Sequence, residues 1–221
     1  MLMMTSLDGK IDGKCFEKAE NNALSDFYDA QIFEIAQAWG NGANTHVRYF
    51  SDDSVDFSNF AGNENDSDNV ILSDKLYAVS FDSKGRVKWK NTTFNYPKNV
   101  ENQILVVTTR QSNPAWRAYL KSKNIPYIFA GDSEIDLPTA LEKLKTLFKI
   151  ERFALTGGAA INAAFIKADL VDEIRLVVMP EVEGSQNLTF CESAENLTKR
   201  FILKDVQRID SDGLFLVYAK K

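Results

Sequence analysis

Cysteine and histidine are scarce in this chain of 221 residues. Cys15 and Cys191 are its only cysteines, they are far apart in sequence, and His46 is its only histidine. So few ligand-type residues exclude a disulfide-stapled secreted domain and leave no cluster with metal-ligand spacing. We therefore expect a reduced, cytoplasmic protein without a metal site.

Long hydrophobic runs and an excess of basic charge are also missing. No apolar stretch approaches the roughly 18 residues that a membrane span needs, and the apolar start at Met1 turns polar by Thr5 without a signal-peptide core. The net charge of −5 and the pI near 5.1 argue against a nucleic-acid or anionic membrane surface. With 44% hydrophobic residues, the chain is expected to fold as a single domain over residues 1–221.

The second half of the chain alternates between strand-like and helix-like segments. β-Branched and aromatic runs at 104–108, 127–130 and 153–156 alternate with helical patterns at 113–123, 137–148 and 159–167. This alternation predicts parallel strands joined by helical crossovers. The C-terminal runs at 174–179, 201–209 and 214–219 have no helices between them, and the turn at 210–213 predicts a hairpin. We expect an α/β fold whose mostly parallel central sheet is flanked by helices and has an antiparallel C-terminal edge.

The first half is less regular. Strands are expected at 1–5, 37–41, 76–81 and 86–89, with a turn at 82–85 between the last two. Asp26 is a plausible N-cap for a helix that carries Phe27 and Ile35. The acidic stretch 51–69 predicts an exposed and partly mobile insertion.

The strongest local motif is Gly157-Gly158, which lies between the apolar run 153–155 and the helical pattern that follows. Adjacent glycines at a strand-to-helix junction allow a tight turn and expose backbone N–H groups at the helix N-terminus, which suits a phosphate. The same pair can also serve only as a tight turn.

Two segments of the chain together resemble the dihydrofolate reductase-like family. Residues 4–11 (MTSLDGKI) are similar to the first-strand signature of the riboflavin-biosynthesis pyrimidine reductase branch. Residues 157–162 (GGAAIN), followed by 168–174 (ADLVDEI), match its second signature, which residues 177–184 (VVMPEVEG) continue. The resemblance implies a dihydrofolate reductase-like fold. It also implies an NADPH-dependent reductase that transfers a hydride to a C=N bond of a pyrimidine, pteridine or ribosylamino substrate. Members of this branch are commonly homodimers.

The resemblance also implies where the cofactor would bind. Gly157 and Gly158, with Ala159 and Ala160 at the helix start, would hold the pyrophosphate. Thr109 and Arg110 would contact the adenosine phosphate, for which a planar guanidinium is well suited. Arg110 could instead be an ordinary exposed residue at a strand end.

A further cofactor loop is predicted at Gly42 and Thr45, where Ala43 replaces the arginine that the family pattern expects. This replacement weakens the preference for NADPH over NADH. His46, beside that loop, is expected to be solvated or at the cofactor's edge.

The substrate side is predicted at Ser6, Asp8 and Lys10, with Asp8 and Lys10 as catalytic candidates. Residues two apart on an extended segment face the same way, so both charged groups could enter one cleft. An ordinary turn with a surface lysine is the alternative. Thr156 stands where many riboflavin-type members have glutamate, which puts the natural substrate of that branch in doubt.

Three interpretations remain open. The chain is a stand-alone reductase, since the His-x-Glu and Pro-Cys-x-x-Cys zinc signature of the linked deaminase is missing. Alternatively, it is a nucleotide-binding protein that kept the fold and lost the reaction, or an α/β domain of other chemistry. The C-terminal strands, with Phe201, Leu203, Phe215 and Val217, supply more apolar side chains than one sheet face needs, which favours a homodimer.

Overall fold

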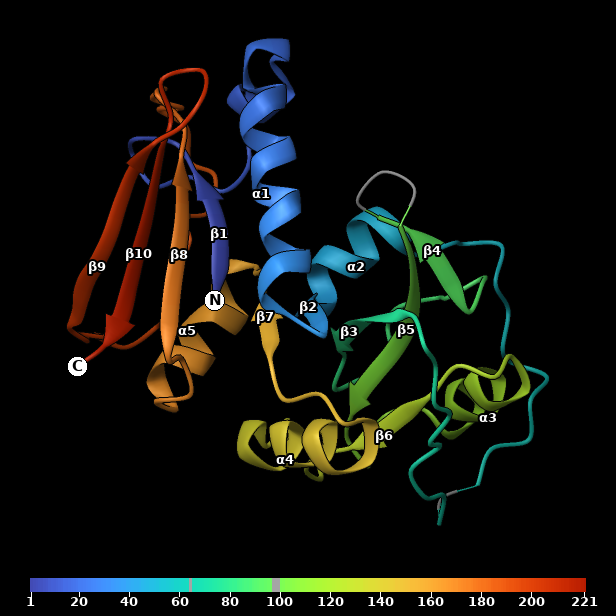
Figure 1. The fold of residues 1–221 in the computed structure, drawn as a ribbon. Coiled ribbons are helices and arrows are strands. Elements are labelled where there is room, and N and C mark those ends of the chain that lie inside the picture. The colour runs from blue at the N-terminus through green and yellow to red at the C-terminus, as the bar shows by residue number, and fades with distance from the viewer. Residues whose placement is uncertain (64, 97–99) are drawn as a thin grey trace. The chain divides into compact units, whose positions relative to one another are not determined.

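The computed structural model describes residues 1–63, 65–96 and 100–221, drawn as a ribbon in Figure 1. They form two compact units, one made of Met1–Ala36 with Ala154–Lys221 and the other of Gln37–Phe153. The first unit is therefore assembled from both ends of the sequence. Within the described residues, no helix is long and apolar enough to cross a membrane. The expected fold class is confirmed, because helices accompany sheets whose crossover strands are parallel.

The unit of residues 37–153 contains a parallel sheet. Its parallel strands, in spatial order, are β2 (Ala38–Gly42), β3 (Leu76–Phe81), β5 (Glu101–Thr108) and β6 (Tyr127–Phe129). The short β4 (Thr93–Asn95) pairs antiparallel with the start of β5. The helices of this unit are α2 (Ala43–Phe50), α3 (Pro114–Ser122) and α4 (Leu137–Phe148). Because the strands are parallel, their carboxyl ends share one edge of the sheet.

Strand β5 is buried on both faces, which explains its unbroken apolar run. Ile104 and Val106 pack with Trp116 of α3 in one hydrophobic core. On the opposite face of the sheet, the rings of Tyr77 in β3 and Phe148 in α4 lie 5.5 Å apart. Helices α3 and α4 therefore cover opposite faces, as the predicted crossovers require.

Both of these helices begin where their sequences predict. The Asn113 side chain accepts a hydrogen bond from the Ala115 N–H at 2.9 Å, and Pro114 occupies the first turn. The Asp136 carboxylate caps α4 by accepting from the Thr139 N–H at 2.8 Å. Lys149 ends α4 in the left-handed conformation with φ of 61°.

The other unit contains a four-stranded sheet in the order β1–β8–β10–β9. Its strands are β1 (Leu2–Thr5), β8 (Glu173–Val178), β9 (Phe201–Arg208) and β10 (Leu214–Lys220); β1 is parallel to β8 and the other pairs are antiparallel. Its α-helices are α1 (Asn22–Ile35) and α5 (Ala159–Lys167), and two 3-10 turns, Lys14–Glu17 and Ala19–Asn21, lead into α1. Strand β7 (Phe153–Leu155) lies where one unit passes into the other.

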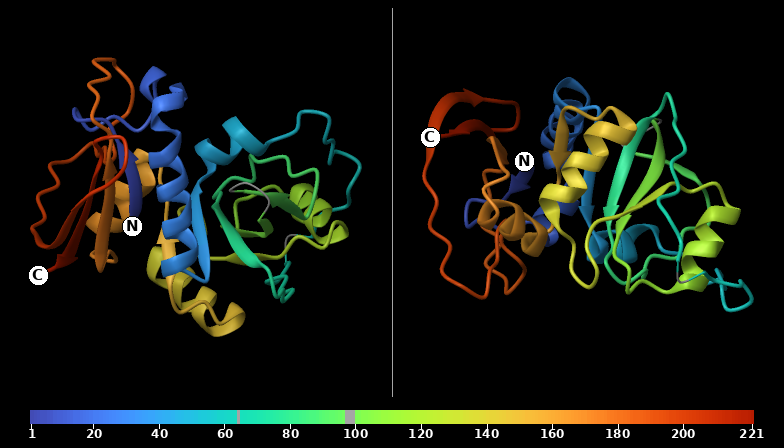
Figure 2. Two further views of the ribbon diagram at one scale, coloured as in Figure 1. Left: turned by 45° about the horizontal axis from the view of Figure 1, so that its top comes forward. Right: turned by 90° about the horizontal axis from the view of Figure 1, so that it is seen from below.

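Helix α1 covers one face of this sheet. Leu24 of α1 packs with Val177 and Phe215 in a single core, and the Phe27 ring lies 5.1 Å from the Phe215 ring. Strand β9 is the edge strand of the sheet, in the red C-terminal part of the chain in Figure 2, and seven of its eight residues are exposed. The predicted hairpin between β9 and β10 is confirmed.

Two local predictions are wrong. Helix α1 begins at Asn22 rather than after Asp26, because the preceding 3-10 turn at Ala19–Asn21 already sets a helical path. Residues 86–89 do not form a strand, because their backbone is bonded elsewhere. The Arg86 and Val87 N–H groups donate to the Asp82 carboxylate at 2.6 and 2.8 Å.

The acidic stretch 51–69 is exposed over much of its length, as expected, but its end is firmly anchored; Glu64 lies outside the described residues. Asp68 accepts from the Phe129 N–H at 2.8 Å and from Lys143 Nζ at 2.7 Å. Asn69 pairs with Tyr127 in a β-bridge. This part of the insertion therefore covers the edge of the sheet beside β6.

Candidate functional site

Residues 6–10 form a tight turn after β1 rather than an extended segment. The Gly9 N–H donates to the Ser6 carbonyl at 3.0 Å, and Gly9 has φ of +75°, which favours glycine. The buried Ser6 hydroxyl donates to Asp8 Oδ1 at 2.6 Å and accepts from the Lys10 N–H at 2.9 Å. The expected extended segment is therefore not formed, because the turn breaks the two-residue repeat of a strand on which the shared direction of Asp8 and Lys10 was based.

The Asp8 carboxylate organises a neighbouring loop. It accepts from the backbone N–H groups of Glu183 and Gly184, each at 3.0 Å. The Ser6 hydroxyl and these two N–H groups lower the pKa of Asp8 to about 2. Asp8 is therefore a fixed anion near neutral pH, and it is poorly suited to donate a proton.

Lys10 has a different set of contacts. Its Nζ donates to the Asn187 carbonyl at 2.8 Å, and in the part of the chain that the structure describes it pairs with no carboxylate. An ammonium has three donor hydrogens, so one is used and two remain. Lys10 is half-buried and is therefore the better placed of the two charged candidates to contact a bound anion or a lone pair.

The loop that meets both residues is the segment 181–192, here called the strap. Besides its contacts with Asp8 and Lys10, its backbone pairs with the turn through Leu7 N–H to Glu181 O at 2.7 Å, Ile11 N–H to Leu188 O at 3.0 Å, and Phe190 N–H to Gly9 O at 3.1 Å. The strap also reaches α5, where the Glu192 N–H donates to Ala159 O at 3.3 Å. The structure thus joins the two sequence signatures within this unit through the strap.

The Gly157-Gly158 turn leads directly into α5, as predicted. Gly157 has φ of +102°, and a Cβ there would meet the Met3 side chain at 3.1 Å. Gly158 caps α5 without a side-chain hydrogen bond. The first-turn N–H groups of Ala159, Ala160 and Ile161 have no acceptor among the described residues. They are free to bind an anion.

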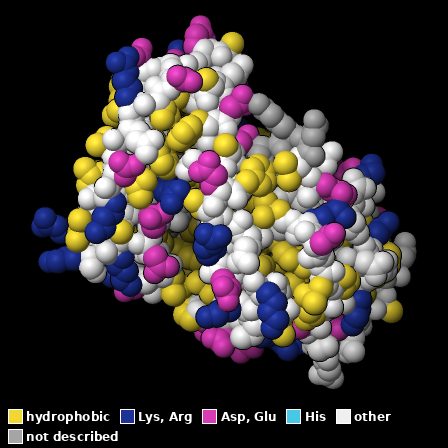
Figure 3. Space-filling view, in the orientation of Figure 1, with side chains coloured by type: hydrophobic (Ala, Val, Ile, Leu, Met, Phe, Trp, Pro, Cys, Tyr) yellow, Lys and Arg dark blue, Asp and Glu magenta, His cyan; other side chains and the backbone are white. Residues whose placement is uncertain are grey.

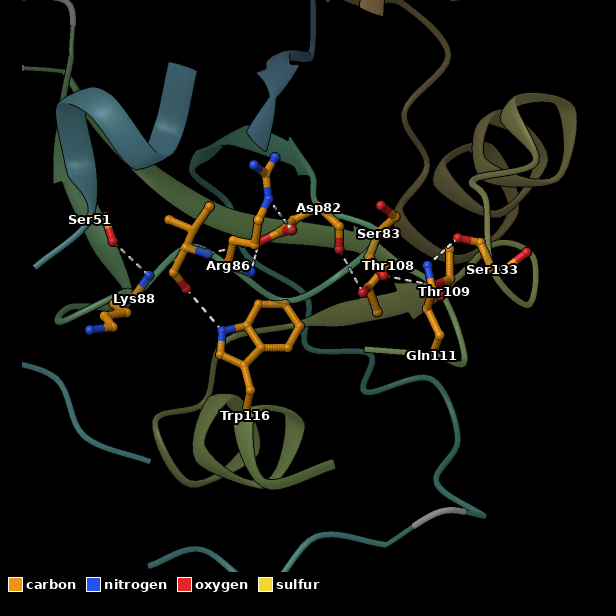
Figure 4. A network of polar contacts seen from close by, with 11 residues as sticks. Ser51, Asp82, Ser83, Arg86, Lys88, Thr108, Thr109, Gln111, Trp116 and Ser133 are labelled. Atoms are coloured by element: carbon orange, nitrogen blue, oxygen red, sulfur yellow. Dashed lines mark hydrogen bonds and ion pairs between the residues drawn. The ribbon is translucent and has the colours of Figure 1, made fainter. Parts of the chain in front are cut away.

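In the other unit, the ends of β3 and β5 are tied into one polar network, shown in Figure 4. The Thr108 hydroxyl donates to the Asp82 carbonyl and the Thr109 hydroxyl to the Ser83 carbonyl, both at 2.7 Å. Thr109 is fully buried, so its hydroxyl orders the turn after β3. That turn carries the exposed cation Arg86, whose Nε lies 4.0 Å from Asp82 Oδ1. In Figure 4 the rest of its guanidinium points away from Trp116 and Thr108.

Arg110 is held against the sheet. Its guanidinium lies 3.9 Å from the centre of the Phe129 ring and donates to the Asp66 carbonyl. The side chain is still exposed, so the predicted phosphate contact remains a prediction, but these contacts orient the guanidinium without any ligand.

Gly42 and Thr45 begin helix α2, which the sequence presented as a loop. Gly42 caps the helix in an extended conformation, and Thr45 is half-buried in its first turn. His46 follows and is fully buried, and neither ring nitrogen is hydrogen-bonded to any residue in the described ranges. Its ring lies 5.2 Å from that of Trp89, and burial lowers its pKa to about 3. The prediction of a solvated His46 is wrong, because the unforeseen helix turns it inward.

Several residues of these two sites were missed. The turn at 82–85 was recognised only as a turn, although Asp82 is followed by cations at Lys84 and Arg86, a signal for an anion site at a strand end. The resemblance covers only residues 181–184 of the strap, and the contacts of the strap with residues 7–11 were not foreseen, because they join residues far apart in sequence.

Comparison with known proteins identifies the family of this chain. The RibD C-terminal domain model matches residues 1–215, and the chain belongs to that family. A solved pyrimidine reductase-like protein from Corynebacterium diphtheriae has a TM-score of 0.67, with 16% identity over 99% of this chain and 89% of that one. At this identity the likeness shows the fold alone.

Two curated relatives share one name, 2,5-diamino-6-ribosylamino-4(3H)-pyrimidinone 5′-phosphate reductase. The one from Methanothermobacter thermautotrophicus is 32% identical over 82 residues, which is 37% of this chain and 38% of the relative. The one from Aquifex aeolicus is 28% identical over 99 residues, which is 45% of this chain and 44% of the relative. The matched part thus spans less than half the length of each relative.

Proposed function

We propose that this chain is an NADPH-dependent reductase of a ribosylamino-pyrimidine phosphate. The C=N carbon of the substrate gains a hydride and its nitrogen gains a proton, which leaves an amine and NADP⁺. When bound, NADPH supplies the hydride. The protein's residues would hold cofactor and substrate in place and supply charge.

The observation that carries this proposal is the start of α5. The Gly157-Gly158 turn is followed by the unpaired N–H groups of Ala159, Ala160 and Ile161. Such a cluster at a helix N-terminus fits a pyrophosphate through hydrogen bonds and the helix dipole. Family membership supports the same assignment.

A preference for NADPH is supported by the charges at the carboxyl edge of the parallel sheet. Lys84 and Arg86 are exposed on the turn after β3, and Arg110 follows β5. A 2′-phosphate would find a cation there, which is the usual basis for selecting NADPH over NADH. The Asp82 carboxylate does not oppose this, because it is buried and accepts two backbone N–H groups.

Lys10 is proposed as the charged group beside the reacting C=N bond. Its free donor hydrogens would stabilise charge on the substrate or pass a proton to the nitrogen. Asp8 would act indirectly by fixing the strap that meets Lys10. Ser6 is buried and bonded within the turn, so its predicted substrate contact would need the turn to open.

Titration with NADPH and NADH, followed by a turnover screen, tests the proposal. A reductase binds NADPH and oxidises it only when a ribosylamino-pyrimidine phosphate is added. Binding without turnover of that substrate or of dihydrofolate would instead identify a nucleotide-binding protein that has lost the reaction, which Thr156 in place of the family's glutamate would favour. No binding of either cofactor would contradict the proposal.

We further propose that the chain forms a homodimer through the sheet of β8, β9 and β10. Met3, Leu176, Leu216 and Val206 are cross-strand neighbours that form one row on a face of this sheet. The exposed fraction of the residue rises along the row from 5% at Met3, through the half-buried Leu176 and Leu216, to 54% at Val206. Figure 3 shows hydrophobic side chains among charged ones over this part of the surface. Leu203, at 49% exposure, adds to this open end, whereas Phe215 and Val217 are buried beneath α1 and do not contribute. A two-fold contact would cover the open edge.

A further inference from the structure

Asn162 in the first turns of α5 is fully buried and makes one unusual contact. Its Nδ2 donates to the Phe190 carbonyl in the strap at 2.7 Å, while its Oδ1 has no partner among the residues that the structure describes. A buried amide with an unmet acceptor carries an energetic penalty, which the hydrogen bond to the strap offsets in part. That bond fixes the strap to the helix that follows Gly158.

The strap segment held by Asn162 is the one that positions Lys10. Phe190 donates its own N–H to Gly9 O at 3.1 Å, and Thr189 forms a β-bridge with Lys10. Two residues earlier, Asn187 O accepts from Lys10 Nζ at 2.8 Å. The Asn162 side chain is therefore linked, through the strap backbone at residues 187–190, to the two neighbours of Lys10 and to the Lys10 ammonium.

We infer that Asn162 is a positioning residue that sets the location of the Lys10 ammonium through the strap. This inference rests on the proposed function, because it gives Lys10 a role beside the reacting bond. Asn162 would keep Lys10 in register with the start of α5, where the cofactor pyrophosphate is proposed to lie. Misplacing a reacting group by about an ångström is enough to slow catalysis strongly.

A double-mutant cycle tests the inference. Asn162→Ala removes the donor, and Lys10→Ala removes the group that it is meant to position. We expect Asn162→Ala to lower kcat about tenfold or more in the wild-type background and less than about twofold in the Lys10→Ala background. Equal losses in the two backgrounds would overturn the inference, as would an unchanged kcat in Asn162→Ala.

Asn21 provides a matched control in the same unit. Its side chain is also buried and donates to a backbone carbonyl, that of Cys15, at 2.8 Å. Asn21→Ala should therefore lower the unfolding midpoint as Asn162→Ala does while keeping kcat. A similar kcat loss in Asn21→Ala would show that general loosening of the unit explains both variants, which overturns the inference.

Amide hydrogen exchange without any cofactor gives a second measurement. Asn162→Ala should speed amide exchange at Phe190 and Ile11, whose N–H groups form the hydrogen bonds between the strap and residues 9–11. Asn21→Ala should leave both exchange rates unchanged. Unchanged exchange in Asn162→Ala would contradict the inference. If Lys10→Ala keeps full activity or wild type fails to bind NADPH, the proposed function fails instead, and the exchange result separates the two cases.

Discussion

The guanidinium of Arg110 stacks on the ring of Phe129 at 3.9 Å, so an arginine that the sequence assigns to a phosphate is already oriented by an aromatic face. The guanidinium of Arg86, on the neighbouring turn, is held more loosely, with its Nε 4.0 Å from Asp82 Oδ1. Substituting each arginine in turn therefore tests which of them contacts the 2′-phosphate of NADPH.

If Arg110 grips the 2′-phosphate, Arg110→Ala weakens NADPH by about 1.5–3 kcal/mol more than NADH, as expected for a charge-assisted contact. Arg86→Ala is the matched variant, and a selective loss there would move the phosphate contact to the turn after β3. Titration of each variant with both cofactors measures this. Equal weakening of NADPH and NADH in both variants would contradict a 2′-phosphate site at this edge.

The two glycines before α5 should respond differently to substitution. Gly158 has φ of −77°, which any residue adopts, so Gly158→Val should fold normally and bind NADPH at least about tenfold more weakly, because its side chain blocks the pyrophosphate. Circular dichroism checks the fold and fluorescence titration the affinity. A folded variant with unchanged affinity would remove the pyrophosphate from this turn.

Gly157→Ala should instead reduce stability. Its φ of +102° is unfavourable for alanine, and the new Cβ would press on Met3. We expect a loss of at least about 1 kcal/mol in the free energy of unfolding, measured with urea. Wild-type stability in this variant would mean that the turn does not adopt the described conformation.

His46 makes stability depend on pH. Burial lowers its pKa to about 3, from an ordinary value of 6.5, so the folded protein binds fewer protons than the unfolded chain between these values. Stability is therefore full above about pH 6.5 and falls by about 1.4 kcal/mol per pH unit below it. His46→Phe removes this pH-dependent contribution, so the free energy of unfolding, measured with urea, should change less between about pH 4.5 and 6.5 than in wild type. An equally steep profile in the variant would contradict the assignment.

The dimer proposal predicts the effect of one charge on β9. Val206→Lys should give a mass near that of one 24.9 kDa chain by light scattering, whereas wild type gives twice that mass. Leu72→Lys is the control, because Leu72 is 66% exposed but belongs to the other unit. A monomeric wild type at micromolar concentration would exclude the dimer.

The parts of the fold that sequence predicted well are those with local causes. Strand β5 is an apolar run buried on both faces, and α4 has an Asp136 cap and a regular apolar stripe. The wrong predictions concern segments whose structure depends on side-chain contacts outside the segment itself. Residues 86–89 contain good strand formers, but the Asp82 carboxylate captures two of their N–H groups. No propensity reports such a contact.

The same distinction applies to the candidate sites. The Gly157-Gly158 turn was predictable, because glycine conformation and a following helix are local properties. The partners of Asp8 and Lys10 were not, because Glu183 and Asn187 lie more than 170 residues further along the chain. The sequence also wrongly predicted an extended segment through Asp8 and Lys10, since Gly9 allowed a turn instead.

The most direct test of the central claim is NADPH oxidation by the purified chain in the presence of 2,5-diamino-6-ribosylamino-4(3H)-pyrimidinone 5′-phosphate. We predict oxidation that requires this substrate, consumes one NADPH for each substrate reduced, and is strongly slowed in Lys10→Ala. Tight NADPH binding with no oxidation, or oxidation that Lys10→Ala leaves unchanged, would contradict the account.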